Sequence, residues 1–245
     1  MLRSKAVSDR NTDSPLNPSE HYARLLSLAA HELRTPASVV GGYLRMFLQT
    51  AGGELGESHR RMLEEAEKSL GHMTMLVGQI SELGRLEART ATVVDQPADL
   101  FEMLGKLAED VHEAEERGVQ LRVRGLAQGA RVNGDVPRLR AAFTAFLRAV
   151  LREQPVETLV VADRRRIDGA APAALVVIAR EADLERAASA RPAAAFDEWR
   201  GGLGLALPIA RVVLERHGGR VWSPLAGDAD AASRGAIVVS VPLEE

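Results

Sequence analysis

Apolar side chains near the start of the chain recur every seven residues in two parallel rows. Rows with this repeat form the apolar seam of a helix that packs in a bundle or coiled coil. We expect that helix to run from about Ser19 to Gln49, since Ser19 follows a proline and suits a helix start. The two rows are Leu26, Leu33, Val40 and Phe47, and Ala30, Ala37 and Leu44.

A second helix is expected from about Glu57 to Ala88, after a glycine-rich break at residues 51–56. Two long helices joined by a short loop form an antiparallel hairpin. One hairpin cannot bury its own seam, so the pattern predicts a homodimer with a four-helix bundle. The apolar stripe of the second helix is Leu63, Ala66, Leu70, Met73, Val77, Ile80 and Leu83.

Beyond residue 95 the pattern changes to helices interleaved with short alternating or apolar runs, which predicts a two-layer α+β sandwich. We therefore divide the chain into a flexible tail (1–19), a helical hairpin (20–90) and a sandwich domain (95–245). The expected helices are 100–117 (ended by Gly118), 137–153 and 205–216. The expected strands are 119–123, 157–162, 174–179, 220–223 and 236–241.

Composition narrows the class of protein. The 245 residues are 46% apolar and 27% charged, and the net charge of −3 gives no reason to expect nucleic-acid binding. Cysteine is absent, which excludes disulfides and thiolate metal sites. No apolar run reaches the ~20 residues that span a bilayer and no signal peptide is visible, so we expect a cytoplasmic protein with no membrane partner. Lys106 follows a glycine but no glycine-rich loop, which rules out a P-loop.

The candidate chemistry lies in one hexapeptide, His31-Glu32-Leu33-Arg34-Thr35-Pro36, inside the first helix. His31 lies off the apolar seam, so its imidazole should face solvent and keep one nitrogen free for nucleophilic attack. Glu32 could accept a hydrogen bond from the other ring nitrogen, which would fix the tautomer and raise the nucleophilicity of the free one.

The hexapeptide resembles the phosphoacceptor motif of the sensor histidine kinases of two-component signalling. The resemblance implies that His31 accepts a phosphoryl group and exchanges it with an aspartate on the receiver domain of a response regulator. It further implies that Glu32 is the acid/base residue and that Thr35 positions water for dephosphorylation of the regulator.

The second half resembles the ATP-binding domain of the same kinases, a fold of the GHKL ATPase type. Gly134-Asp135, the aromatic stretch 196–199 and the glycine-rich stretch 201–207 carry this resemblance. It implies that Gly201, Gly202 and Gly204 let the backbone approach phosphates at the start of the following helix.

Two other motifs of that domain are broken. In register, the Mg²⁺ ligand of the family's asparagine box falls on Ala149, the preceding asparagine on Ala145, and the box's lysine on Arg152. An alanine methyl cannot bind a cation that demands oxygen. The aspartate that accepts from the adenine amino group falls on Arg180, which offers only donors. The glycines that follow that aspartate read as Ala182 and Leu184.

Three hypotheses stay open. The first is a dimeric histidine phosphotransferase or phosphatase with impaired use of ATP, and hence no cofactor. The second is an active kinase that binds ATP and Mg²⁺ at an atypical site, helped by Glu153, which lies one turn after Ala149, or by Glu181 and Asp183. The third is a non-catalytic dimeric scaffold.

Overall fold

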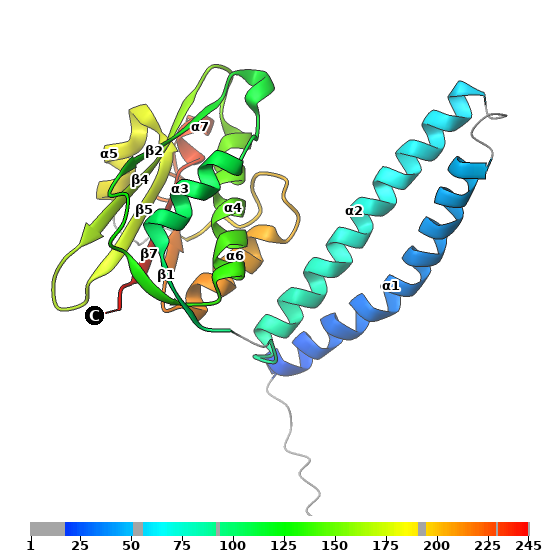
Figure 1. Cartoon of the computed structure of the whole chain (residues 1–245), viewed down its shortest axis with the longest axis horizontal. Helices are drawn as coiled ribbons and strands as arrows, with labels where there is room; N and C mark the ends of the chain where they lie inside the picture. Colours follow the sequence, from blue (N-terminus) through cyan, green and yellow to red (C-terminus); the bar gives the residue numbers. More distant parts are fainter. Residues whose placement is uncertain (1–17, 51–55, 92–93, 191–194, 229, 245) are drawn as a thin grey trace, which may run out of the picture.

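The structure is a computed structural model that describes residues 18–50, 56–91, 94–190, 195–228 and 230–244. It contains a long helical hairpin and a separate α/β body (Figure 1). The predicted flexible tail lies outside the described residues up to residue 17, and most of the glycine-rich break lies outside them at 51–55. The helices are α1 (Pro18–Thr50), α2 (Glu57–Glu87), α3 (Leu100–Asp110), α4 (Val136–Glu153), α5 (Leu184–Ser189), α6 (Ala206–Arg216) and α7 (Ala231–Arg234). The strands are β1 (Gln96–Asp99), β2 (Gln120–Gly125), β3 (Arg131–Gly134), β4 (Leu159–Ile167), β5 (Ala173–Arg180), β6 (Arg220–Trp222) and β7 (Ile237–Pro242).

The predicted antiparallel hairpin is confirmed, and small residues bring its two helices together. Ala30 is fully buried and Ala37 nearly so, which places the second apolar row of α1 against α2. Near the C-terminal end of α2 the backbones approach closely, because a Cβ atom on Gly84 would lie 2.7 Å from Oγ of Ser27. A larger residue at Gly84 would push the helices apart.

The first apolar row of α1 remains largely uncovered in the single chain. Leu33, Val40 and Phe47 are 48%, 49% and 54% exposed. Met73, which the pattern placed in the buried stripe of α2, is also half exposed. The hairpin therefore buries one apolar row and presents the other.

A five-stranded sheet with strand order β2-β4-β5-β7-β6 forms the second domain, together with a separate antiparallel pair of β1 and β3. The expected hairpin of β4 and β5 is confirmed, with Val160 opposite Arg180 and Ile167 opposite Ala173. β2 joins β4 in parallel, and the other neighbours in the large sheet are antiparallel. The predicted two-layer α+β sandwich is thus observed.

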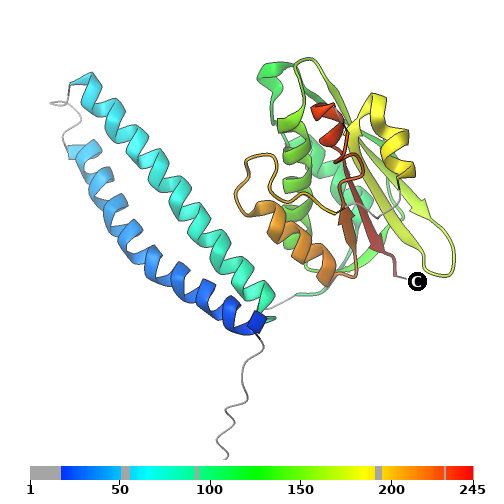
Figure 2. The ribbon, with the colours of Figure 1, turned by 180° about the vertical axis from the view of Figure 1, so that it is seen from behind.

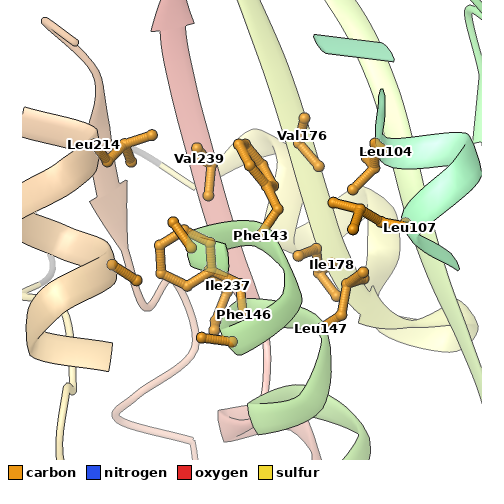
Figure 3. Packing of buried hydrophobic residues seen from close by; sticks show 14 of the residues in the cluster. Leu104, Leu107, Phe143, Phe146, Leu147, Val176, Ile178, Leu214, Ile237 and Val239 are labelled. Carbon is orange, nitrogen blue, oxygen red and sulfur yellow. The ribbon is translucent and has the colours of Figure 1, made fainter. Parts of the chain in front are cut away.

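The main core lies between the inner face of this sheet and helices α3, α4 and α6 (Figures 1, 2 and 3). Phe143 and Phe146 of α4 are fully buried and meet edge to face, with ring centroids 5.8 Å apart. Leu86, near the end of α2, also belongs to this core. The hairpin is therefore anchored to the sandwich domain by a buried side chain.

The structure corrects the sequence interpretation at several places. Helices α5 and α7 were not predicted, and β4 runs on to Ile167, beyond the expected end at residue 162. The helix expected over 100–117 ends at Asp110, and a separate short 3-10 turn over Glu115–Arg117 precedes Gly118. Asp99 caps this helix by accepting hydrogen bonds from the N–H groups of Phe101 and Glu102. Strand β3 was not predicted, because its four residues alternate too briefly to give a pattern.

Among the described residues, no helix is both long and apolar enough to cross a bilayer.

Candidate functional site

The His31 side chain stands in solvent on α1, as its place off the apolar seam predicted. The side chains of His31 and Glu32 are 74% and 72% exposed, and His31 Nδ1 lies 3.5 Å from Glu32 Oε1. This separation is longer than an ordinary hydrogen bond, so a small side-chain rotation is needed to form one. Thr35 is exposed one turn further along the same face of the helix. Nε2 of His31 has no bonded partner among the described residues and is available for attack.

The glycine loop before α6 docks on α2. The N–H of Leu205 donates a hydrogen bond of 2.9 Å to Oε1 of Gln79, and a Cβ atom on Gly204 would lie 2.8 Å from Leu76. Ser27 faces Gly84 and Gly41 faces Leu70 across the hairpin, so the middle of α2 lies opposite the stretch of α1 that carries the hexapeptide. The sandwich domain is therefore held at the level of His31.

All three predicted glycines of this loop adopt the left-handed conformation, with φ of +72°, +59° and +62° at Gly201, Gly202 and Gly204. This conformation favours glycine. The loop rests directly on α4, because a Cβ atom on Gly201 would lie 3.0 Å from Cα and 3.1 Å from Cβ of Ala149. Ala149 is completely buried. The space beside the predicted metal-ligand position is thus filled by backbone.

Arg152, which takes the place of the family's lysine, is already bonded. Its Nε donates to Glu113 at 2.5 Å, and its Nη1 donates to the carbonyl oxygens of Gly201 and Gly202 at 3.3 and 3.1 Å. Glu113 also accepts from Arg148 at 2.5 Å. Burial alone would raise the pKa of Glu113, but the hydrogen bonds from Arg152 and Arg148 outweigh it and hold that pKa low.

Glu153, the alternative metal ligand, is also partnered. Its Oε1 accepts from the N–H of Gly201 at 3.1 Å, and its Oε2 lies 3.5 Å from Nε of Arg200. Burial raises the pKa of Glu153 and the positive charge of Arg200 partly offsets this. Both residues line a cavity of about 310 Å³ with Asp197, Ala226, Ala231 and Arg234.

Arg200 holds the glycine loop in place through a side chain that lies in the protein interior. Its side chain is 5% exposed, and burial lowers its pKa. The guanidinium donates to the carbonyl oxygens of Arg234, at 2.8 Å, and of Gly235 and Ala236, and to Oγ of Ser223. Phe196 adds an edge-to-face contact with Phe146, whereas Trp199 is 79% exposed. Phe196 therefore anchors the start of the aromatic stretch and Arg200 anchors the chain just after it, whereas the indole of Trp199 between them faces solvent.

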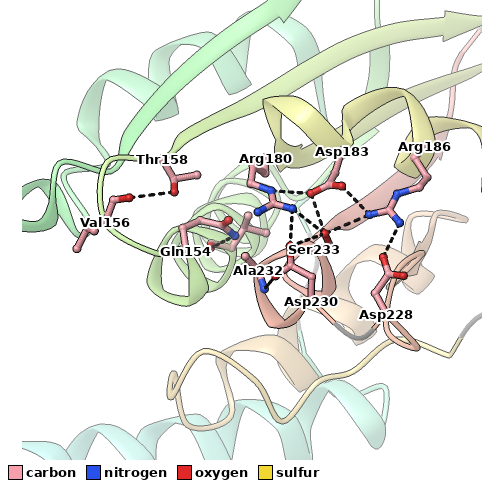
Figure 4. Close-up of polar contacts among 11 residues, drawn as sticks. Gln154, Val156, Thr158, Arg180, Asp183, Arg186, Asp228, Asp230, Ala232 and Ser233 are labelled. Carbon is pink, nitrogen blue, oxygen red and sulfur yellow. Dashed lines mark hydrogen bonds and ion pairs between the residues drawn. The ribbon is translucent and has the colours of Figure 1, made fainter.

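Arg180, at the predicted adenine-acceptor position, lies in a cluster of six side chains that we call the Arg180 cluster (Figure 4). Arg180 donates to Asp183 and Asp230 at 2.7 Å each, and to Ser233 at 2.8 Å. The other members are Arg186, which pairs with Asp183 at 2.6 Å, and Asp228, which lies 2.9 Å from Arg186. The cations and anions of the cluster satisfy one another.

Hydrogen bonds within the Arg180 cluster favour the charged forms of Asp183 and Arg180. Burial alone would raise the pKa of Asp183, but hydrogen bonds from Arg180, Arg186 and Ser233 outweigh it and hold that pKa below its usual value. The hydrogen bonds to Asp183 and then Asp230 raise the pKa of Arg180.

The sequence interpretation placed Ala149, Arg152, Glu153 and the glycines in one region, and the structure brings them into contact. It did not foresee that Arg200, Glu113 and Gln79 complete this region. Arg200 carried a weak signal, an arginine directly before a pair of glycines. Among the described residues, no group of three His, Asp or Glu side chains is placed to hold a metal ion.

Comparison with known proteins agrees with the hairpin geometry. Residues 22–89 match the His Kinase A (phospho-acceptor) domain. The chain is 30% identical over 217 residues to the sensor protein CutS of Streptomyces coelicolor, which covers 81% of this chain and 48% of that protein. It is 26% identical over 190 residues to the swarming motility regulation sensor protein RssA of Serratia marcescens, covering 66% of this chain and 40% of that protein. The chain therefore spans less than half the length of these relatives.

Solved structures show the same fold. Full-length ShkA, described in complex with AMPPNP, superposes with a TM-score of 0.66 at 22% identity, covering 90% of this chain and 46% of that one. The Acinetobacter baumannii histidine kinase AdeS gives a TM-score of 0.52 at 15% identity, covering 88% of this chain and 98% of that one. Because residues 22–89 match the phosphoacceptor domain and 81% of the chain is 30% identical to CutS, this chain belongs to the histidine kinase family of two-component systems.

Proposed function

We propose that this protein exchanges phosphoryl groups between His31 and an aspartate of a response regulator, and that it does not charge His31 with ATP itself. The observation that carries the proposal is a contrast between the two sites. His31 is exposed beside Glu32 with Nε2 free, whereas the glycine loop rests on Ala149.

The chemistry at His31 follows from its surroundings. Nε2 attacks the phosphorus of the aspartyl phosphate, a P–N bond forms, and the P–O bond breaks with its electrons returning to the aspartate carboxylate. Glu32 lies nearest Nδ1 and accepts the proton that the imidazole gives up. Thr35, exposed one turn away, is placed to orient a water for hydrolysis of the regulator's acyl phosphate.

The residues of the second domain do not fit Mg²⁺-ATP. Phosphoryl transfer from ATP needs a metal ion that neutralises developing charge. The position of the family's metal ligand offers only the methyl of Ala149, and Arg152 and Glu153 are bonded to the loop. Arg180 presents donors and is bound by Asp183 and Asp230.

We also infer that the working unit is a homodimer. Leu33, Val40 and Phe47 form a row of half-exposed apolar side chains on one helix. Two such rows would bury each other in a four-helix bundle. Contiguous exposed apolar surface of this kind marks an interface.

The test is phosphoryl exchange with purified receiver domains that have been charged with radiolabelled acetyl phosphate. The wild-type chain should acquire label that is stable to alkali, as a phosphohistidine is, and the His31→Ala variant should acquire none. His72→Ala, an exposed histidine on α2, is the matched control and should behave as wild type. Unchanged exchange by His31→Ala would contradict the proposal and favour the scaffold.

A second candidate is an ATP-dependent kinase with an atypical site, favoured by the three glycines that keep the left-handed conformation. Calorimetric titration of ATP, with and without Mg²⁺, separates it from the first. We expect no binding. Mg²⁺-dependent binding together with labelling of His31 from radiolabelled ATP would establish the kinase instead.

A further inference from the structure

We infer that the outer face of the sheet carries a binding site for a small amphipathic monocarboxylate, separate from the phosphoacceptor and nucleotide-like sites. The inference does not depend on the proposed function. It starts from the unequal covering of the two faces of the sheet. Helices α3, α4 and α6 cover the inner face, whereas the six-residue helix α5 and the loop around Leu225 cover only part of the outer face.

A groove of about 410 Å³ lies beside α5 on this outer face. This volume falls in the usual range of small-molecule pockets, about 300–1,000 Å³. The residues that line the groove are mostly small and apolar. They come from the turn between β4 and β5, the start of β5 and the end of α5, and include Ala171, Pro172, Ala173, Leu175, Ala188 and Ala190.

Trp222 of β6 is one of the residues that line this groove. The side chain is buried, at 6% exposure, and Nε1 has no hydrogen-bond partner among the described residues. Nε1 is itself shielded from solvent, so a molecule in the groove would contact the indole ring and not its N–H. Trp222 therefore supplies apolar surface and an optical reporter of binding.

Arg220 and Ser240 supply polar side chains that line the groove. Arg220 lies two residues before Trp222 on β6 and therefore on the same face of the sheet. It is exposed and pairs in register with Ser240 of β7, which supplies a hydroxyl. No ion pair is formed by Arg220 among the described residues.

The charged side chains around the groove indicate which kind of ligand would bind there. The interdomain cavity, the cavity beside α3 and the cavity near Arg200 are each lined by carboxylates. The described lining of this groove contains none, although the whole chain has a net charge of −3. A cation and a hydroxyl beside an apolar floor suit a carboxylate head on an apolar body.

Octanoate is a suitable probe, with octan-1-ol as the uncharged probe of equal chain length. The chain has two tryptophans, so Trp199→Phe leaves Trp222 as the only indole reporter. We expect octanoate to change the fluorescence of Trp222 saturably. Octan-1-ol should bind at least about tenfold more weakly, which corresponds to the loss of about one charge-assisted hydrogen bond.

Variants distinguish a specific carboxylate site from a general apolar patch. Calorimetry measures the affinity of each variant for octanoate. Arg220→Gln should weaken octanoate about tenfold, and Ala188→Leu should block it by filling the groove. Arg122→Gln removes the same charge from an exposed position on β2 and should leave binding unchanged. Equal binding of octan-1-ol, or wild-type affinity in Arg220→Gln, would overturn the carboxylate site. Absence of saturable binding by either probe would overturn the groove as a ligand site.

Discussion

The two domains treat their polar side chains in opposite ways. On the hairpin, His31, Glu32 and Thr35 face solvent and make few contacts with the rest of the protein. In the sandwich domain, the arginines at the nucleotide-like site are bonded to internal carboxylates and carbonyls. Free groups are available to another molecule, whereas groups that satisfy one another stabilise a fold. Under the function proposed above, the hairpin carries the chemistry and the bonded arginines of the sandwich domain serve its structure.

The largest expected effect comes from Arg200, because it bonds several buried groups at once. Arg200→Met should lower the free energy of unfolding by about 3–5 kcal/mol, since it leaves buried carbonyls and Glu153 without their cation. Urea unfolding of the full chain measures this. Arg166→Met is the control, because it breaks only exposed contacts, a pair with Asp168 and a hydrogen bond to the carbonyl oxygen of Gly129, and it should change stability by about 1 kcal/mol or less. A small effect at Arg200 would mean that the loop is not held from inside.

The Arg180 cluster predicts a pH dependence. The pKa of Asp183 is lowered in the folded state, so its contribution to stability is complete above the unfolded value of about 3.9 and is lost as pH falls through the lowered pKa. Asp183→Asn should cost about 2 kcal/mol at pH 7, because hydrogen bonds to a charged group are lost. The cost should shrink below pH 4.

Unfolding by urea at several pH values checks this, and Asp168→Asn, in an exposed pair, should leave the pH profile unchanged. Equal costs at pH 7 and pH 3 would contradict the assignment.

On the hairpin, substitutions in the exposed apolar row should weaken self-association of the chain and not the stability of the single chain. Val40→Asp should weaken self-association at least about tenfold, about 1.4 kcal/mol, since it places a charge in the proposed dimer seam. Sedimentation equilibrium measures the dissociation constant. Leu28→Asp, at 58% exposure on the His31 face of the same helix, should leave association unchanged. A monomeric wild-type chain would remove the four-helix bundle from the proposal.

The smallest effect is expected where the two domains meet. Gly204→Ala should loosen the dock, because its Cβ would collide with Leu76 and Gln79. Gly202→Ala is a matched control, since its φ of +59° carries similar strain and nothing lies within 4 Å of the added atom. Both should lose about 1 kcal/mol from backbone strain.

Only Gly204→Ala should broaden the distribution of distances between the two domains. Because the chain has no native cysteine, spin labels attached at His59→Cys and Asp168→Cys can measure that distribution. The same distribution in both variants would show that the glycine loop does not hold the domains together.

The sequence predicted elements whose signal is local. The seven-residue rows gave α1 to within one residue at each end, and apolar runs gave β4, β5 and β7. The motif spacing placed Ala149, Glu153 and the glycines in one region, and in the structure Ala149 and Glu153 contact Gly201. In each case one segment carries the pattern, so neighbours along the chain are enough to reveal it.

Contacts between distant segments could not be read in the same way. Glu113 and Arg152, or Gln79 and Leu205, are far apart in sequence, and nothing in their own surroundings marks them as partners. The sequence predicted Arg180 as a donor that faces adenine, but its bonds to Asp183 and Asp230 depend on how the loops before β7 close. Pairing of charges is a property of the folded chain rather than of any segment.

The contact between Gly201 and Ala149 bears on how readily a metal ligand could be introduced at position 149. The main chain of the loop occupies room that a longer side chain would need, with 3.0 Å between the ideal Cβ position of Gly201 and Cα of Ala149. Asparagine at position 149 would have to displace the loop, together with its bonds to Arg152 and Glu153. A metal ligand at this position would therefore require several substitutions at once.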